Sequence, residues 1–486
     1  MTGYDLVVTG GTAVLPGVGE VPADIGVRDG RIAAITDRLR PADGQRHLDA
    51  TGKVVLPGAV DSHYHLGIYR DLATDTESET TSSLVGGVTS VISYFRTGSH
   101  YLNRTGPYRE IFPEVLSTVA GRAKVDYAFH LAPMTREHID ELPWLVAQGV
   151  TSFKYYMFYK GLNLAGSSRD ASGYTMAEDY DLGHLFEIME KVAELDAATA
   201  ARVSVSLHCE QAELLRVFIE RAKADPAVSG LAEYSAGRPP LTERLSIEEG
   251  AVLADATGAR VNLLHLSSAL AVQTARSVVG RYPGLDSNLE TTLHHLALAC
   301  EDLAGKGLGP KVNPPIRGRS DNEALWRAVA AGEIGTVASD HACCGEELKG
   351  DDLWPAQPGF GGTALLYPVL LSEGYHKRGL SLARIVDLVA TNPARVFNLP
   401  GKGAIAVGAD ADLVLADLNL EQVVSTELCR SAQDHCPFEG IAVRGWPVTT
   451  VVRGEVMLDR GEVSDSFPGR YLHRGGSRAR GQRRGE

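Results

Sequence analysis

Two histidines separated by one residue are the first feature of this sequence that could do chemistry. His63 and His65 follow an apolar, β-branched run that includes Val54, Val55 and Val60. Residues i and i+2 of a β-strand point to the same face, so both imidazoles are predicted to converge on one point. Neutral imidazole is a common ligand for divalent transition metals. The pair therefore either begins a metal site or consists of two hydrogen-bonded strand histidines.

Four further residues that can bind metal stand in or at the ends of other apolar runs. Lys154 interrupts one run, His208 and His265 end two more, and Asp340 ends a fourth. Together with the first two histidines they are too many for one zinc ion, which usually takes three protein ligands and a water, and they suit two ions. Such ions lie roughly 3.5–4 Å apart and need a bridging anion. A buried lysine can supply that anion if its amine, kept neutral by burial, adds carbon dioxide to become a carbamate.

A centre of this kind predicts the hydrolysis of an amide. Two divalent cations bring four positive charges, and the carbamate on Lys154, the carboxylate of Asp340 and a bridging hydroxide remove three of them. The site stays electrophilic, with the bridging hydroxide as nucleophile and Asp340 as the general base that returns the proton to the leaving nitrogen. Ordinary structural roles remain possible, since Lys154 could form a salt bridge and Asp340 could cap a helix.

The elements that must position these residues are strands that alternate with helical segments. Eight strands are the number that closes a (β/α)₈ barrel, in which the chemistry collects at the C-terminal ends of the strands. The fold class predicted is therefore α/β, with a TIM-like (β/α)₈ barrel. The eight candidate strands are 60–65, 89–95, 125–131, 152–157, 203–208, 261–266, 288–293 and 336–340.

Both ends of the chain carry a different pattern, with short alternating runs separated by Gly-Gly, Asp-Gly and Pro-Gly signals. This pattern is typical of antiparallel β-structure and predicts a small β-sandwich lobe built from both chain ends. The last fifteen or so residues carry five arginines, beginning with Arg474, among Gly and Ser, which indicates a disordered tail. The predicted domains are 1–56 and 400–465 for the two parts of the lobe, 57–399 for the catalytic barrel, and 466–486 for a C-terminal extension that is disordered at its end.

Two internal segments carry further signals. The Gly/Ser-rich stretch between Lys160 and Tyr174 is either a surface loop or a mobile lid over the site. Residues 185–195 have apolar side chains at helical spacing and predict an amphipathic helix whose role is packing. Cys343 and Cys344 are adjacent, which favours ordinary apolar packing over a role in a site.

Composition excludes several classes of protein. A net charge of -14 argues against nucleic acid as a partner. No apolar run approaches the roughly 20 residues that span a bilayer, and the N-terminus has no basic region before an apolar one, so no membrane association is expected. The six cysteines form no C-x-x-C pair, which is typical of a reducing compartment. The sequence predicts a cytoplasmic protein.

Several motifs occur in a specific order and spacing. Together they resemble the cyclic amidohydrolases, the family of dihydropyrimidinases and hydantoinases, allantoinases and dihydroorotases. The likeness covers nearly the whole chain. Its motifs are Pro57-Gly58-x-x-Asp61-x-His63-x-His65, Gly86-Gly87-Val88-Thr89, Ser152-Phe153-Lys154, His208, His265-Leu266-Ser267-Ser268, Asn313-Pro314-Pro315-Ile316-Arg317, Ser339-Asp340-His341-Ala342, Thr391-Asn392-Pro393-Ala394-Arg395, and the run from Lys402 to Leu413.

The resemblance implies a binuclear metal centre, usually of Zn²⁺, with N6-carboxylysine as the bridge. It also implies a homo-oligomer, a tetramer or a dimer. In the implied arrangement one ion is held by His63, His65 and Asp340, the other by His208 and His265, and carboxylated Lys154 bridges them.

The resemblance also implies residues that contact the substrate. Tyr159 matches the tyrosine that hydrogen-bonds the substrate carbonyl and its oxyanion, and Asn313 stands where the family binds the ring imide. Dihydroorotases carry an arginine where this chain has Gly67, which speaks against dihydroorotate, and Arg70 is displaced from that position. The hydantoinase asparagine that precedes the glycines near 359–362 is replaced here by Gln357, so one substrate contact differs.

The function predicted is hydrolysis of a cyclic amide or imide C–N bond, of the hydantoinase or dihydropyrimidinase type, with a small molecule as substrate. Aromatic residues 155, 156 and 158 favour a ring with a bulky 5-substituent. An allantoinase, or a hydrolase of an unusual linear amide, is the alternative. A non-catalytic scaffold is a third hypothesis, but such relatives typically lose metal ligands and all six are present here.

Overall fold

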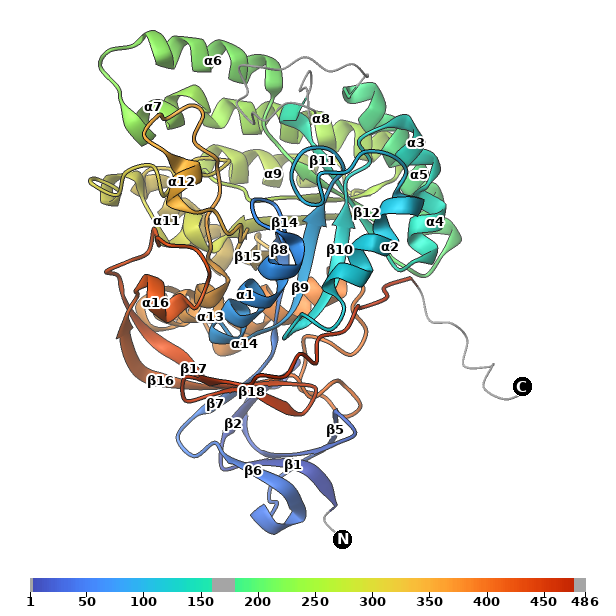
Figure 1. The fold of residues 1–486 in the computed structure, drawn as a ribbon, viewed down its shortest axis with the longest axis vertical. Coiled ribbons are helices and arrows are strands. Elements are labelled where there is room, and N and C mark those ends of the chain that lie inside the picture. Colours follow the sequence, from blue (N-terminus) through green and yellow to red (C-terminus); the bar gives the residue numbers. More distant parts are fainter. Residues whose placement is uncertain (1–2, 160–179, 476–486) are drawn as a thin grey trace.

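An eight-stranded parallel sheet forms the centre of the computed structural model, which describes residues 3–159 and 180–475 (Figure 1). The strands follow one another in chain order around the sheet. A parallel bridge between Tyr64 and His341 joins the first strand to the segment after the last one. The predicted (β/α)₈ barrel is confirmed. Its strands are β8 (Ala59–Tyr64), β9 (Val88–Phe95), β10 (Asp126–Leu131), β11 (Ser152–Tyr156), β12 (Ser204–His208), β13 (Arg260–Leu263), β14 (Ser287–Thr292) and β15 (Thr336–Ala338).

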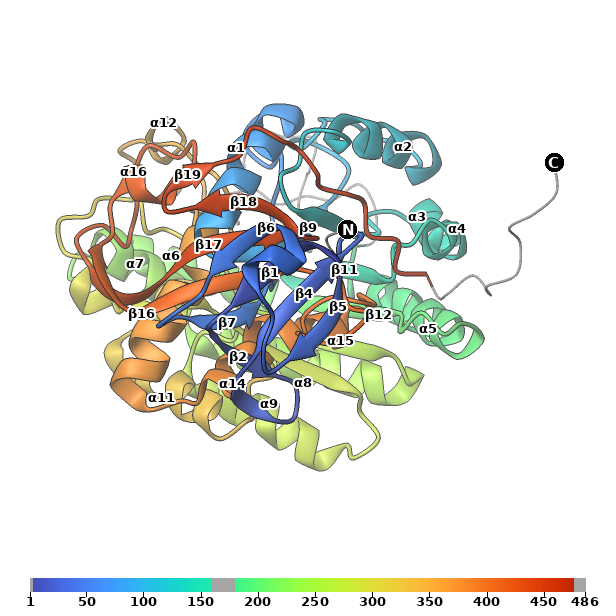
Figure 2. The same cartoon turned by 90° about the horizontal axis from the view of Figure 1, so that it is seen from below.

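Helices surround the barrel on its outside (Figures 1 and 2). The predicted amphipathic helix is α5 (Leu182–Ala198), which buries Leu185, Ile188 and Val192 and begins where the Asp181 side chain accepts hydrogen bonds from two backbone N–H groups. None of the described helices is long and apolar enough to cross a membrane. The larger of the other helices are α1 (Leu72–Val85), α2 (Tyr108–Val119), α6 (Ala212–Ala224), α8 (Pro240–Thr257), α9 (Ala269–Arg281) and α11 (Arg319–Ala330).

The Gly-Gly motif between α1 and β9 is explained by backbone geometry. Gly87 has a φ of +72°, a conformation that side chains other than glycine rarely adopt. A Cβ atom on Gly86 would lie 2.0 Å from the carbonyl oxygen of Thr363, so only glycine allows this close approach. The motif therefore turns the chain tightly from the helix into the second barrel strand.

The two ends of the chain meet in one β lobe, which lies at one end of the barrel in Figure 1 and faces the viewer in Figure 2. The strand β7 (Val54–Pro57) pairs antiparallel with β16 (Leu413–Val423), which pairs in turn with β17 (Ala442–Val452). A four-stranded sheet contains β1 (Tyr4–Thr9), β4 (Asp24–Arg28), β5 (Arg31–Thr36) and β6 (Gly44–Asp49). Side chains from both sheets share one hydrophobic core, as predicted for a sandwich.

The chain after the lobe returns to the barrel. The backbone of Tyr127 in β10 exchanges hydrogen bonds with Arg470 and Leu472 at 3.0 and 2.7 Å. Arg474 is buried, and its guanidinium donates to the Ser152 hydroxyl at 2.7 Å and to the Phe129 carbonyl. The prediction of a disordered tail is therefore wrong for Arg474, because a carbonyl and a hydroxyl of the barrel satisfy its donors. The stretch 160–174, proposed as a loop or lid, lies outside the described residues.

A buried ion cluster joins the lobe to the barrel. The Nζ atom of Lys402 lies 2.6 Å from a carboxylate oxygen of Asp126 at the start of β10, 2.7 Å from Asp412 beside β16, and 3.0 Å from Asp410. The lysine side chain is 1% exposed. Removing one member of such a cluster leaves uncompensated buried charge, which is far more costly than loss of a surface ion pair.

We therefore expect Lys402→Met to lower the free energy of unfolding by about 3–5 kcal/mol, because three carboxylates lose their shared cation. Thermal and urea unfolding followed by circular dichroism would measure the change. The control is Lys377→Met, whose amine pairs with Glu373 while its side chain is 58% exposed, and which should cost about 1 kcal/mol or less. Equal effects of the two substitutions would contradict this account of the junction.

Candidate active site

One cavity contains all the site residues that the sequence predicts. It opens to solvent, and both polar and aromatic side chains line it, which is typical of a small-molecule site. The predicted metal-binding side chains of the cavity lie in barrel strands or just after their C-terminal ends, as expected for this fold, and loops supply most of the remaining wall. The predicted site residues that line it are His63, His65, Lys154, Tyr159, His208, His265, Asn313 and Asp340.

Three atoms that could bind a metal ion meet on one side of the cavity. The Nε2 atoms of His63 and His65 each lie 3.1 Å from the same carboxylate oxygen, Oδ1 of Asp340. Ligands bound about 2.1 Å from a zinc ion lie roughly 3 Å from one another, so this spacing fits a shared cation. His63 lies in β8 and His65 directly follows its last residue, and both imidazoles reach the same carboxylate oxygen, as the i, i+2 spacing predicts.

Two further imidazoles meet nearby. Nε2 of His265 lies 2.8 Å from Nδ1 of His208. The other ring nitrogen of His208 donates to Glu210 at 2.7 Å, and Arg238 donates to the same carboxylate through Nε at 3.0 Å. Because Glu210 takes the proton-bearing nitrogen, the Nδ1 lone pair of His208 is directed at His265, where a second cation would fit.

The remote nitrogens of the first two histidines are also held. Nδ1 of His63 is hydrogen-bonded to Glu290 at 2.7 Å, and Nδ1 of His65 is hydrogen-bonded to the Tyr101 hydroxyl at 3.0 Å. Burial lowers the pKa of His63 well below its ordinary value, so its ring is neutral at neutral pH. A neutral ring that donates through Nδ1 presents the Nε2 lone pair to the cavity. The donor set therefore fits divalent cations.

Lys154 is buried beside these ligands. Its Nζ atom lies 3.4 Å from Nε2 of His63 and 4.2 Å from the centre of the Tyr94 ring. Burial lowers the pKa of Lys154 to about 7, although the charge of Asp340 acts in the opposite direction. A large fraction of the amine is therefore uncharged near neutral pH, which is the form that can react with carbon dioxide.

Two of the candidate ligands have an unusual backbone. Asp340 has a φ of +51° and His265 a φ of +34°, in the left-handed region that favours glycine. This conformation costs a residue with a Cβ atom about 1–2 kcal/mol, and it persists only where neighbouring contacts hold it. The strained backbone thus belongs to two residues whose side chains line the cavity.

Tyr159 and Asn313 lie at the cavity wall. Tyr159 ends a short turn of helix after β11, and its ring stacks on Tyr156 with centroids 4.4 Å apart. The side-chain oxygen of Asn313 already accepts a hydrogen bond from the Tyr234 hydroxyl, which leaves the backbone as the better placed partner for a ligand. Arg70 does not line the cavity, and its guanidinium lies 3.5 Å from Cys343 Sγ.

Sequence reasoning missed Glu210, Glu290 and Tyr101, which hold the remote nitrogens of three histidines. A signal was available for Glu290, since a charged residue inside a barrel strand needs a buried partner. No comparable signal marks Tyr101, because its loop position says nothing about which imidazole it meets.

Comparison with known proteins agrees with this geometry. Residues 54–457 match the amidohydrolase family. The chain belongs to this family. An allantoinase of Rubrobacter xylanophilus is 32% identical over 473 residues, which cover 97% of this chain and 98% of the relative. A D-hydantoinase of Ralstonia pickettii is 30% identical over 487 residues, covering 97% and 99%.

A solved L-hydantoinase (dihydropyrimidinase) from Arthrobacter aurescens has the same fold as this amidohydrolase. It superposes with a TM-score of 0.85 at 30% identity, and covers 97% of this chain and 100% of that one. The predicted resemblance to cyclic amidohydrolases and the predicted enzyme class are confirmed.

We expect Glu210→Gln to weaken metal retention by about 10–100-fold, because the amide removes the charge that fixes the His208 tautomer and neutralises Arg238. Elemental analysis after dialysis against graded chelator would measure this. Glu220→Gln, at an exposed position on α6, the helix that follows Glu210, is the matched control. Equal retention by both variants would show that Glu210 does not support the site.

Proposed function

We propose that this amidohydrolase opens the C–N bond of a cyclic amide or imide in a hydantoinase-type or dihydropyrimidinase-type reaction that depends on two divalent cations. The observation that carries the proposal is the meeting of two separate ligand clusters in one cavity, with a buried lysine beside them. The names of the relatives support the choice of a cyclic substrate. We also propose, from the family resemblance, a cytoplasmic homo-oligomer, either a tetramer or a dimer.

The residues that would hold the cations form two sets. Imidazole nitrogens and carboxylate oxygens are the ligands that zinc prefers, so Zn²⁺ is the proposed metal. When bound, two such ions polarise the scissile carbonyl and lower the pKa of water. One set would be His63, His65 and Asp340, the other His208 and His265, and Lys154 would contact both as N6-carboxylysine.

Carboxylation of Lys154 forms a new N–C bond. The neutral amine attacks carbon dioxide and releases one proton to solvent, and the product is a carbamate with one negative charge. Burial favours the neutral amine that attacks, because it lowers the pKa of this amine to about 7. Neighbouring cations would stabilise the carbamate, because they compensate its negative charge.

The other residues would handle the proton and the developing charge. Asp340 would take the proton of the attacking water and deliver it to the leaving nitrogen. The phenol of Tyr159, at the cavity wall, would donate to the carbonyl oxygen as it becomes an oxyanion. The backbone at Asn313 would orient the ring imide.

The cavity wall also bears on the choice of substrate. Around the polar centre it is lined by Ile68, Tyr69, Tyr156, Phe158 and Val312. Burial of an apolar substituent against such a wall contributes about 25 cal/mol per Å². We therefore propose a hydantoin with an apolar or aromatic 5-substituent as the favoured substrate. Allantoin is the second candidate, because an allantoinase is among the similar relatives.

A substrate panel tests the proposal. Metal-replete enzyme should open 5-substituted hydantoins with the highest kcat/KM, dihydrouracil and allantoin with lower values, and dihydroorotate least, since Gly67 offers no side chain to its carboxylate. Ring opening can be followed by loss of ultraviolet absorbance and by mass spectrometry of the product. No turnover of any cyclic amide would reject the proposed reaction.

Lys154→Ala should abolish most activity, and short-chain carboxylic acids should restore part of it by occupying the place of the carbamate. In wild-type protein freed of carbon dioxide, ¹³CO₂ held at the same dissolved concentration should produce a carbamate resonance faster at pH 8 than at pH 6, because the free amine increases as the pH rises through about 7. The resonance should be missing in Lys154→Ala. A fully active alanine variant would remove the carbamate from the mechanism.

Tyr159→Phe should lower kcat by about 10²–10³, the effect of losing one oxyanion donor, with metal content unchanged. Tyr155→Phe is the matched control, because the Tyr155 hydroxyl donates to the Asp181 carbonyl at 2.7 Å and its ring stacks on Tyr180. If the two substitutions reduced kcat equally, Tyr159 would have no special role.

A further inference from the structure

The strained backbone of Asp340 is held from both sides by buried carboxylates. Ser339, the preceding residue, donates to Asp61 in β8 through its backbone N–H at 3.0 Å and its hydroxyl at 2.5 Å. His341, the following residue, interacts through Nε2 with Glu79 in α1 at 2.8 Å. The strand β15 itself ends at Ala338, so these contacts add to the bridge between His341 and Tyr64 in holding Asp340.

The ring of His341 is fixed in orientation and in tautomer. Its Nδ1 atom accepts hydrogen bonds from the backbone N–H groups of Gly362 and Thr363, at 3.1 and 3.3 Å, so Nε2 carries the proton that Glu79 accepts. The ring stacks on Tyr64 with centroids 4.6 Å apart. The backbone carbonyl of His341 accepts from the N–H of His65, another candidate ligand, at 2.9 Å.

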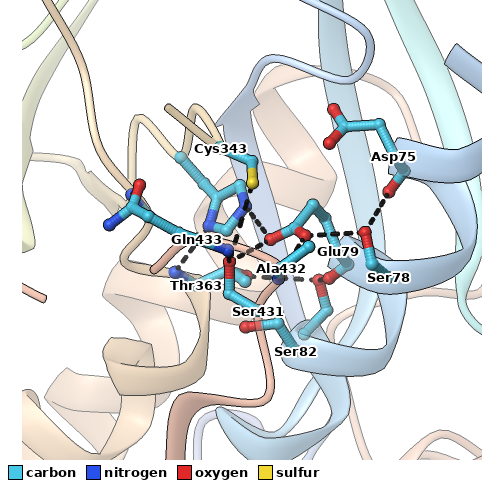
Figure 3. Close-up of polar contacts among 12 residues, drawn as sticks. Asp75, Ser78, Glu79, Ser82, Cys343, Thr363, Ser431, Ala432 and Gln433 are labelled. Carbon is cyan, nitrogen blue, oxygen red and sulfur yellow. Dashed lines mark hydrogen bonds and ion pairs between the residues drawn. The ribbon is translucent and has the colours of Figure 1, made fainter. Parts of the chain in front are cut away.

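Glu79 is a buried and charged carboxylate. Burial alone would raise its pKa, but hydrogen bonds from His341, Ser431 and Ala432 outweigh this effect and hold the pKa below its ordinary value. The Ser78 hydroxyl also donates to Glu79, at 2.7 Å (Figure 3). Among the described residues, no lysine or arginine forms an ion pair with Glu79, and His341 contacts it as a hydrogen-bond donor through Nε2. A buried anion of this kind is retained only where donors surround it.

Two of those donors come from the β lobe. The hydroxyl of Ser431 donates to Glu79 at 2.6 Å and the backbone N–H of Ala432 at 2.9 Å. Oε1 of the next residue, Gln433, accepts from the backbone N–H groups of Cys344 and Gly361, at 3.2 and 2.8 Å. As Figure 3 shows, this short lobe segment lies against α1 and against the loop that follows Asp340.

We propose that Glu79 is a positioning residue for Asp340, acting through His341, and that the lobe segment 431–433 completes this support. The inference rests on the proposed metal-dependent function, in which Asp340 is both a ligand and the proton carrier. It assigns the lobe a direct part in the site, because loss of the lobe donors would loosen the carboxylate that holds His341. The competing hypothesis is that the hydrogen bonds of segment 431–433 only attach the lobe to the barrel and do not affect Asp340.

The test compares Glu79→Gln with Glu77→Gln. Glu77 lies on the same helix with its side chain 44% exposed and pairs with exposed Arg122, so the control removes the same charge at the surface. We expect Glu79→Gln to lower kcat and metal retention by about 10–100-fold, with a much smaller change in KM. The control should match wild type. Metal retention is measured by elemental analysis after dialysis against chelator, and folding by circular dichroism.

Ser431→Ala keeps the inference testable if Glu79→Gln fails to fold. It leaves both Glu79 and His341 in place and removes one donor, so it should lower kcat and metal retention in the same direction but less. The inference would be overturned if the variants that fold had a lower melting temperature but wild-type kcat and metal retention. The contacts would then only attach the lobe to the barrel.

The same measurements separate this inference from the proposed function. If the wild type retains metal but opens no cyclic amide, while Glu79→Gln loses the metal, the inference stands and the substrate proposal fails. If the wild type is active and the Glu79 and Ser431 variants equal it, the inference fails alone. A wild type that retains no metal would overturn both.

Discussion

Burial of polar side chains in one cavity is the constraint on which the rest of this structure depends. Four imidazoles, a lysine and a carboxylate line the same space, and each would cost free energy in an apolar interior without a partner. The barrel resolves part of this constraint, because three of the four rings have a hydrogen-bond partner on the nitrogen remote from the cavity. Glu290 and Glu210 are hydrogen-bonded to the remote nitrogens of His63 and His208, so each of these rings turns its other nitrogen toward the cavity. The cavity is thereby prepared for cations.

Buried polar contacts also support the residues around the candidate ligands. Asp340 leaves the last barrel strand in a left-handed conformation, and contacts from Asp61 and Glu79 to its two neighbours hold it there. Glu79 depends in turn on the lobe, and the lobe is joined to the barrel by the buried amine of Lys402. The lobe and the barrel are therefore coupled through buried charge at more than one place, rather than through apolar packing alone.

The sequence predicted the strands well because their signals are local. Most of the barrel strands are apolar runs bounded by turn residues, and the candidate ligands stand in such runs or beside their ends. The prediction failed for Arg474, which looks like part of a charged tail but is buried against Ser152 and Phe129. Composition favours disorder there, and only a tertiary contact could reverse it. The pairing of Glu79 with His341 was invisible for a similar reason, since the two residues are separated by 262 positions.

By itself, the sequence determined the barrel, the shared lobe of the two chain ends and the residue types that could bind metal, because periodicity and motif order are written along the chain. The tertiary structure alone decided which nitrogen of His63 or His208 faces the cavity, since the tautomer depends on an acceptor from elsewhere. It alone also placed a lobe segment beside Asp340. Hydrogen bonds between distant segments form only when the whole fold brings those segments together, and no local sequence pattern predicts them.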